Sequence, residues 1–278
     1  VVDYAYAPTS EVLSQIMTKL GVEVVPLSAN VDGEKMSVLP EEFSKALREL
    51  TLISNALDID LGVRLDVGGE KIFLVDHHGN LVPDTAAAAA MACLALRAHP
   101  GGTIVAPVHM PSVLEKIADS HGGQVVRCKV DSHDLMSAAA QEGVVLAADG
   151  TGNFVFPQFQ AAIDGLMATI KLLEFLATQE TTLADMVAGL PEFHVSHKVV
   201  SCPWEAKGTV MRLLNQQYKD RRADLIDGVK ILLGDQEWVL ILPDPDFPRF
   251  HVYAEARADG EAEELADRYV RIVQGLQE

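Results

Sequence analysis

The sequence predicts an α/β fold built from two similar three-layer α/β domains with mixed sheets, followed by a small α+β domain. Two observations support the α/β part: strand-like runs rich in Val and Ile alternate with stretches of helical period, and one pattern of apolar residues and glycines occurs twice. Strands that alternate with helices are typical of βα units around a mostly parallel sheet. The pattern changes after residue 190, where alternating strand-like runs follow one another. We therefore predict domains at residues 1–98, 99–190 and 191–278.

In the first two domains, short Val- and Ile-rich runs predict strands and longer stretches of helical period predict helices. Pro40 and Pro111 stand at first-turn positions of two helices, and Asp84 is a candidate N-cap of a third. The expected strands are 1–6, 22–27, 61–65, 72–76, 103–107, 124–130 and 144–148. The expected helices are 9–20, 40–56, 84–98, 111–121, 132–142 and 160–178.

An internal repeat connects these two domains. Members of the first copy recur 101 positions later, so that Val12, Ile16 and Gly21 correspond to Val113, Ile117 and Gly122. Further along, the offset is 83 positions, and Asp66 and Gly69 correspond to Asp149 and Gly152. Apolar positions alone could match by chance, but glycines and an aspartate that fall in step favour a duplication. We therefore expect the same strand order in both domains.

The last domain is expected to contain a helix, three strands and a second helix after a connecting strand. The connecting strand is predicted at 194–201, the helices at 206–218 and 261–274, and the three strands at 229–233, 238–242 and 250–256. The last two strands alternate apolar and polar residues, as half-buried strands of an antiparallel sheet do.

Charge and composition limit the classes of partner. The formal net charge of the 278-residue chain is −18, from 22 Lys and Arg against 40 Asp and Glu. Such a surface repels phosphate backbones and anionic lipids, which argues against nucleic-acid and membrane partners. No apolar run reaches the length of a membrane span. The three cysteines form no CxxC pair, which indicates a reducing compartment, so we expect a cytoplasmic protein.

Together these features resemble the phosphohexomutase family, the phosphomannomutases and phosphoglucomutases, from its second domain to its fourth. Segments similar to that family follow in one order along the chain: 60–66 with 72–76, 114–118 with 122–130, 164–165, 227–231 and 252–256. The resemblance implies two related α/β domains followed by an α+β domain. It does not include the family's first domain, which carries the phosphorylated serine, so we expect the chain alone to run no mutase cycle.

The family's metal loop, of DGDADR type, holds Mg²⁺ with three aspartates, because a hard cation needs anionic oxygens on one tight turn. The corresponding residues here begin with Asp66, and they end with Glu70 and Lys71. Gly68 stands in place of the middle aspartate, and Glu70 in place of the third. Asp66 and Glu70 could still contact a metal, but we expect a weak Mg²⁺ site at best and no other cofactor.

The family's sugar loop, of GEXSGH type, corresponds to residues 149–153. Its glutamate and serine hydrogen-bond sugar hydroxyls in the family. By this resemblance Asp149, Thr151 and Asn153 are the expected sugar contacts, although a polar turn between two strands would have the same composition.

The family's phosphate loop, of RPSGTEP type, corresponds to residues 242–248. Such a loop binds phosphate through an arginine, hydroxyls and backbone N–H groups. Leu242 stands in place of the arginine, and Asp244 and Asp246 in place of the hydroxyls. Arg249 is the remaining candidate phosphate ligand, and an ordinary surface role for it is the alternative.

Phosphohexomutase-like modules with altered loops also occur behind sugar-1-phosphate nucleotidyltransferases of the mannose-1-phosphate guanylyltransferase type. By this resemblance, our leading interpretation is the mutase-like C-terminal part of such a nucleotide-sugar enzyme, itself non-catalytic. It would bind a sugar phosphate, or regulate or assemble an upstream nucleotidyltransferase domain. One alternative is a phosphomannomutase or phosphoglucomutase that lacks its phosphoserine domain. Another is a purely structural module that forms homo-oligomers. No residue is predicted to be catalytic.

Overall fold

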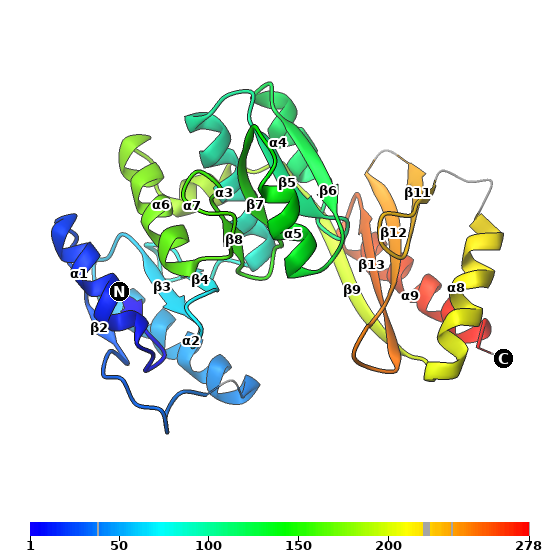
Figure 1. The fold of residues 1–278 in the computed structure, drawn as a ribbon, viewed down its shortest axis with the longest axis horizontal. Helices are drawn as coiled ribbons and strands as arrows, with labels where there is room; N and C mark the ends of the chain where they lie inside the picture. Colours follow the sequence, from blue (N-terminus) through cyan, green and yellow to red (C-terminus); the bar gives the residue numbers. More distant parts are fainter. Residues whose placement is uncertain (38, 219–222, 235, 278) are drawn as a thin grey trace. The chain divides into compact units, whose positions relative to one another are not determined.

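The structure, a computed structural model, describes residues 1–37, 39–218, 223–234 and 236–277 (Figure 1). It has a mixed α/β fold that divides into two compact units. The first unit comprises Val1–Ala106, Leu114–Val126 and Leu135–Leu190, and the second comprises Pro107–Val113, Arg127–Asp134 and Pro191–Glu278. The α/β class is thereby confirmed, whereas the three-domain division at residues 98 and 190 stays a prediction.

Most residues of two four-stranded sheets belong to the first unit, and the two sheets have the same strand order. In the first sheet the order is β2-β1-β3-β4, and in the second it is β6-β5-β7-β8. In each sheet the last strand runs antiparallel to its neighbour, while β1 with β3 and β5 with β7 are parallel. The shared order confirms what the internal repeat predicts. The strands are β1 (Val2–Asp3), β2 (Pro26–Leu27), β3 (Gly62–Leu65), β4 (Ile72–Val75), β5 (Thr103–Pro107), β6 (Gln124–Cys128), β7 (Val144–Ala148) and β8 (Phe154–Val155).

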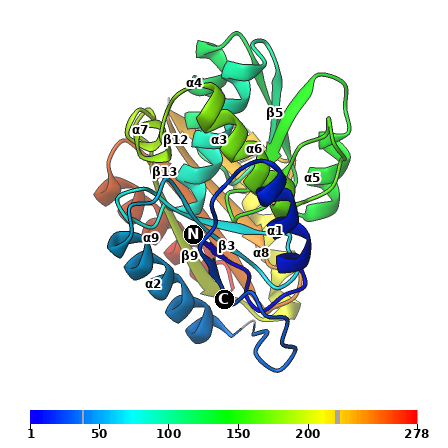
Figure 2. The ribbon, with the colours of Figure 1, turned by 90° about the vertical axis from the view of Figure 1, so that its left-hand side faces the viewer.

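Apart from α7, the helices among these strands lie within the helical stretches that the sequence predicts. They are α1 (Thr9–Lys19), α2 (Pro40–Ala56), α3 (Asp84–Ala98), α4 (Val113–Ser120), α5 (Ser132–Ala139), α6 (Gly165–Thr178) and α7 (Leu183–Ala188). In Figure 2, α2 lies beside the first sheet, and its Leu50 is packed in one cluster with Val1 and Val75. Because α3 consists largely of alanine, its buried side chains allow close approach to β4, β7, α6 and α7.

The start of α3 differs from the prediction. Pro83 is the N-cap residue, with φ −58° and ψ 138°, and Asp84 is already the first helical residue and makes no capping hydrogen bond. The fixed φ of proline turns the chain into the helix one residue earlier than we predicted. The prediction of Asp84 as N-cap is therefore wrong, and its carboxyl group is left for other contacts.

The second unit is an antiparallel sheet covered on one face by two helices. The strand order is β10-β11-β12-β13-β9. On β13, the buried Phe250, Val252 and Ala254 pack with residues of α8 and α9. Side chains alternate along a strand, so Arg249 and His251 lie on the opposite face. The elements are β9 (His194–Ser201), α8 (Trp204–Tyr218), β10 (Ala223–Asp224), β11 (Val229–Gly234), β12 (Glu237–Pro243), β13 (Arg249–Ala256) and α9 (Asp259–Gly275).

The segment Pro107–Val113 packs on this opposite face of the sheet. Val108 lies in one apolar cluster with Trp238, and its carbonyl oxygen accepts a hydrogen bond of 2.8 Å from Lys230 Nζ. Glu255 is buried, and its Oε2 accepts hydrogen bonds from Trp238 Nε1 and from both the backbone N–H (2.9 Å) and the hydroxyl (2.8 Å) of Ser112. A buried carboxylate needs such donors, because water no longer solvates it.

Several element boundaries depart from the predictions. Of the expected strand 22–27 only Pro26–Leu27 is a strand, and of 1–6 only Val2–Asp3. The short strand β8 and the helix α7 were not predicted, because two residues and six residues are too short for a period to be recognised. No helix within the described part of the chain is both long enough and apolar enough to cross a bilayer.

Candidate functional site

Two loops of the first unit occupy equivalent places in the repeat. One connects β3 to β4 and contains Asp66 and Lys71; the other connects β7 to β8 and contains Asp149 and Asn153. The first loop follows the carboxyl end of β3, which is parallel to β1, and the second follows the carboxyl end of β7, which is parallel to β5. Ligands of α/β sheets bind outside the carboxyl ends of the parallel strands, so these loops are where a ligand is expected.

The first loop is closed by the side chain of its own aspartate. Asp66 Oδ1 accepts hydrogen bonds from the backbone N–H groups of Glu70 (2.8 Å) and Lys71 (3.0 Å). Gly69 has a positive φ of 71°, and a Cβ atom there would lie 2.6 Å from Thr9 Cγ2. Only glycine therefore fits at this position, because it tolerates both the left-handed conformation and the close approach. These contacts define the shape of the turn.

This donor set does not fit Mg²⁺ well. One oxygen of Asp66 is engaged by two backbone donors, Glu70 is exposed, and Gly68 contributes no side chain. Mg²⁺ prefers an octahedron of oxygen ligands, usually including one or two free carboxylates. The metal contacts proposed for Asp66 and Glu70 stay a prediction, and no chemical step is derived through a metal here.

The second loop is a compact polar network. Asp149 Oδ1 accepts a hydrogen bond from Thr151 N (2.8 Å), and its Oδ2 accepts from Thr151 Oγ1 (2.9 Å) and Asn153 Nδ2 (2.7 Å). Asn153 is buried, and its Oδ1 has no hydrogen-bond partner among the described residues. A buried amide oxygen without a partner is costly, so it is a natural place for a ligand hydroxyl or a water molecule.

The two loops are joined directly. Ile72 N donates to Gly152 O at 3.0 Å, and Lys71 forms an isolated antiparallel bridge with Asn153. Lys71 Nζ lies 3.4 Å from Thr151 Oγ1, at the outer limit of a hydrogen bond. Lys71, Asp149, Thr151 and Asn153 therefore form one cluster, which we call the paired-loop site. It combines one cation with hydroxyl, amide and carboxylate groups.

Asp84 adds a titratable group near this cluster. Burial raises the pKa of Asp84 to about 6, Lys71 opposes the shift, and the Asp149 carboxylate reinforces it. No hydrogen bond or ion pair of its carboxyl group is present among the described residues. A half-buried carboxyl group with a pKa near neutrality can exchange a proton under physiological conditions, which is typical of functional sites.

The third loop lies in the second unit, between β12 and β13. Here Asp244 pairs with Arg249, whose Nε lies 2.5 Å from Asp244 Oδ2, and with His251, whose Nε2 lies 3.0 Å from the same oxygen. The Arg249 guanidinium also lies over the Phe247 ring, 4.5 Å from its centre. Arg249 is therefore engaged within its own loop, and its predicted phosphate contact stays a prediction.

Comparison with known proteins adds to this geometry. Residues 83–193 match the family described as phosphoglucomutase/phosphomannomutase, alpha/beta/alpha domain III. Over 275 residues the chain is 29% identical to a Methanopyrus kandleri protein described as "probable phosphoglucosamine mutase", covering 98% of this chain and 61% of that protein. It is 26% identical over 275 residues to a phosphoglucomutase/phosphomannomutase of Thermococcus kodakarensis, covering 99% and 60%.

A crystal structure shows the same fold. The phosphoglucomutase/phosphomannomutase family protein of Burkholderia thailandensis superposes with a TM-score of 0.83 at 20% identity, covering 99% of this chain and 60% of that one. The comparisons support membership of the phosphoglucomutase/phosphomannomutase family. The chain spans 61% and 60% of the length of the two curated relatives, so what those proteins do as a whole bears on it only as a proposal.

The structure brings some of the predicted residues together and keeps others apart. Asp149 contacts both Thr151 and Asn153, whereas Asp66 closes a separate turn, and the Glu70 side chain has no hydrogen-bond or ion-pair partner among the described residues. The sequence analysis did not predict that Lys71 and Asp84 lie at the paired-loop site. Lys71 could have been found from its place in the first loop, but Asp84 could not, because its pKa depends on burial by distant segments.

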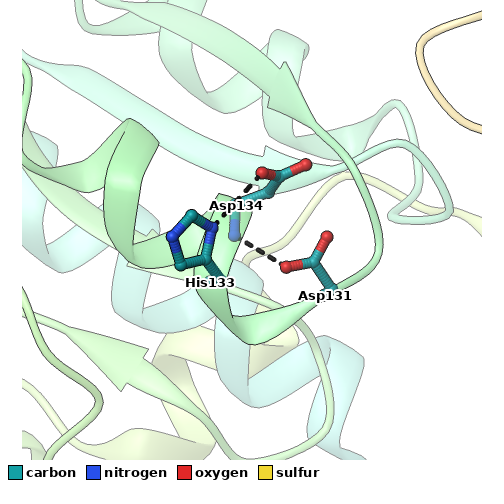
Figure 3. A group of neighbouring side chains, drawn as sticks. All are labelled: Asp131, His133 and Asp134. Atoms are coloured by element: carbon teal, nitrogen blue, oxygen red, sulfur yellow. Dashed lines mark hydrogen bonds and ion pairs between the residues drawn. The ribbon is translucent and has the colours of Figure 1, made fainter.

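A group of three residues whose side chains could together hold a metal ion was also not predicted. Asp131, His133 and Asp134 bring their side chains together at the start of α5 (Figure 3), with all ligand atoms within 4.8 Å of one another. Their contacts are with one another and with Lys129: Asp131 Oδ1 accepts from Asp134 N (2.8 Å), and Asp134 pairs with Lys129 (3.3 Å) and His133 (3.7 Å). These residues therefore stabilise the start of helix α5, where the Asp131 side chain accepts a backbone N–H group.

Proposed function

We propose that this chain is the sugar-binding part of a phosphohexomutase-type protein, and that it recognises a hexose or hexosamine phosphate at the paired-loop site. Asp149, Thr151 and Asn153 would contact the sugar hydroxyls, and Lys71 would supply a positive charge. The two curated relatives are described as a probable phosphoglucosamine mutase and a phosphoglucomutase/phosphomannomutase, and these descriptions favour this interpretation over that of a module behind a nucleotidyltransferase. A nucleotidyltransferase partner, homo-oligomerisation and a cytoplasmic location stay predictions.

One observation carries the proposal: the two repeat-related loops are joined by hydrogen bonds. Lys71 of the first loop therefore lies beside Thr151 and Asn153 of the second. The hydrogen bond from Ile72 to Gly152 and the bridge from Lys71 to Asn153 fix this arrangement before any ligand is bound. Preformed sites lose less conformational entropy on binding than flexible ones. Sugar hydroxyls both donate and accept, and they therefore match a set of carboxylate, hydroxyl and amide groups.

The test is a titration of the full chain with glucosamine 6-phosphate and mannose 6-phosphate, followed by amide NMR and calorimetry. Binding should shift the amide signals of Thr151 and Asn153. Asp149→Asn should weaken binding about tenfold or more, since a hydrogen bond to a charged group contributes roughly 1.5–3 kcal/mol. Asp131→Asn, which removes the same charge at an exposed position in the second unit, is the matched control and should leave affinity unchanged.

Two outcomes would contradict the proposal. One is that neither sugar phosphate shifts the amides of the paired-loop site. The other is that Asp149→Asn and Asp131→Asn weaken binding equally, because the effect would then come from net charge. Titration with the unphosphorylated sugars shows how much of the affinity belongs to the sugar itself.

A further inference from the structure

Two histidines face each other on the side of the second unit's sheet that is opposite to α8 and α9. His197 on β9 is the register partner of Tyr253 on β13, so His251, two residues before Tyr253, is its diagonal neighbour on the same face. His197 Nε2 lies 2.9 Å from His251 Nδ1, and the planes of the two rings are inclined by only 24°. The histidines therefore meet edge to edge, with one ring nitrogen of each directed at the other.

Other side chains fix the two rings in place. His251 Nε2 lies 3.0 Å from Asp244 Oδ2, and because a carboxylate only accepts, Nε2 carries the proton. The Nδ1 atom of a neutral His251 therefore offers its lone pair toward His197. The His197 ring stacks on the Tyr253 ring, with centroids 4.2 Å apart and planes inclined by 8°. Arg249 is paired with Asp244, so the guanidinium charge is balanced within the loop.

This pair has the geometry of two metal ligands. A histidine that binds a metal commonly donates its other ring N–H to a carboxylate, as His251 does to Asp244. An ion that holds two nitrogens at a right angle, at about 2.0–2.1 Å each, separates them by about 2.8–3.0 Å, whereas a tetrahedral angle requires about 3.3–3.4 Å. The 2.9 Å between His197 and His251 matches the right angle.

Exposure and protonation also allow an ion to bind. His197 is exposed, so its ring can turn and water can occupy the remaining positions around an ion. In the hydrogen-bonded pair, His197 Nε2–H donates to His251 Nδ1, and binding requires the other neutral tautomer of His197, with the proton on Nδ1. Both rings stay neutral in this change, and neutral imidazole is the form that ligates metals. The ion thus gains two nitrogen ligands in place of one hydrogen bond.

We propose that His197 and His251 form a two-histidine site for a divalent transition-metal ion that prefers right-angled coordination, Cu²⁺ or Ni²⁺. Square-planar and tetragonal sites with nitrogen ligands are typical of these two ions. Hard ions such as Mg²⁺ prefer oxygen ligands and do not bind here. The site belongs to the second unit, whereas the loop of Asp66 belongs to the first.

The experiment titrates the untagged full chain with Ni²⁺ by calorimetry and with Cu²⁺ by amide NMR and electron paramagnetic resonance. Cu²⁺ is paramagnetic, so it should first broaden the amide signals of residues 196–198 and 250–252, and its resonance spectrum should show coupling to two nitrogens. His197→Asn and His251→Asn should each weaken Ni²⁺ binding at least about tenfold, because loss of an outer partner of a ligand already costs about 10–100-fold.

His194→Asn is the matched control. His194 lies on the same strand and its Nδ1 contacts a carboxylate, that of Asp259, at 2.8 Å, but no second histidine contacts it among the described residues. A single imidazole cannot chelate, so this variant should bind Ni²⁺ as tightly as the wild type does.

Several results would overturn the proposal. One is failure of the wild type to bind either ion, and another is undiminished Ni²⁺ binding by a folded His197→Asn protein. Equal losses in His194→Asn and His197→Asn would also contradict it. So would Cu²⁺ broadening that begins at residues 131–134, since the ion would then be held by Asp131, His133 and Asp134. If neither ligand variant folds, the order in which the wild-type signals broaden still decides.

Discussion

Replacement of Asp3 by alanine tests how the first sheet supports the paired-loop site. Asp3 on β1 and Arg64 on β3 form an ion pair, and their side chains are only 4% and 8% exposed. Asp3 Oδ1 also accepts a hydrogen bond from Ala5 N at 3.0 Å. Arg64 lies near the end of β3, two residues before Asp66 of the first loop. Removal of the carboxylate would leave a buried guanidinium without its ion-pair partner among the described residues.

The magnitude follows from that burial. Breaking a buried pair by removing one partner costs about 3–5 kcal/mol, because the remaining charge is neither solvated nor paired. A domain is typically stable by about 5–15 kcal/mol, so Asp3→Ala should remove a large part of the stability of the first unit. Asp3→Ala combined with Arg64→Met removes both charges and should recover most of the loss, since apolar replacement of a buried pair is often neutral or stabilising.

Urea unfolding measures these differences. Both tryptophans, Trp204 and Trp238, lie in the second unit, so tryptophan fluorescence does not report on the first. Far-ultraviolet circular dichroism and the amide signals of β1 and β3 are the appropriate probes. The reasoning is refuted if Asp3→Ala costs less than about 1 kcal/mol, or if the double variant is less stable than Asp3→Ala.

Three further predictions follow from the site. At pH 7 the ionised Asp84 carboxylate is unfavourable in the folded protein, because burial raises its pKa to about 6. Asp84→Asn should therefore increase the free energy of unfolding at pH 7 by on the order of 1 kcal/mol more than it does near pH 3, where the carboxyl group is neutral in both states. The contribution of Asp84 to wild-type stability then falls as the pH rises between about 4 and 6, and equal effects of Asp84→Asn at both pH values in urea titrations would contradict this. Mg²⁺ should bind no more tightly than about millimolar, and micromolar binding by calorimetry that Asp66→Ala abolishes would disprove it. The chain alone should not interconvert mannose 6-phosphate and mannose 1-phosphate with Mg²⁺ and a bisphosphate activator; turnover in a coupled assay that Asp66→Ala removes would show the opposite.

The fold could be predicted where long segments have one clear period. The helix 84–98 and the strand 103–107 have the expected bounds, because each is a continuous apolar run closed by a proline or glycines. The run 22–27 was misleading, since Val25 is 44% exposed and only Pro26–Leu27 pair with β1. Valines favour strands mainly where a sheet buries them, and these valines are not buried by one. Tertiary context therefore overrides the strand propensity of this run.

The site could be predicted only in part. The sugar-loop residues Asp149, Thr151 and Asn153 do lie together, as their closeness along the chain suggests. The contact between Lys71 and Thr151 joins positions 80 residues apart and depends on the pairing of two loops. Arg249 was expected either to bind phosphate or to lie free on the surface. Its pairing with Asp244 in the same loop was open to inference, because opposite charges flank a turn.

A common principle explains what each loop can still recognise. In all three loops an aspartate side chain accepts backbone N–H groups a few residues further on: Asp66, Asp149 and Asp244. Such an aspartate shapes a turn without a ligand, but it also consumes donors that an anionic ligand would need. In the loop of Asp244 the carboxylate accepts from two backbone N–H groups, from Arg249 and from His251. In the loop of Asp149 one acceptor remains open at Asn153 Oδ1, and Thr151 lies within reach of Lys71. Hydroxyl groups of a ligand can use these atoms, which is the basis of the proposal that a sugar binds at the paired-loop site.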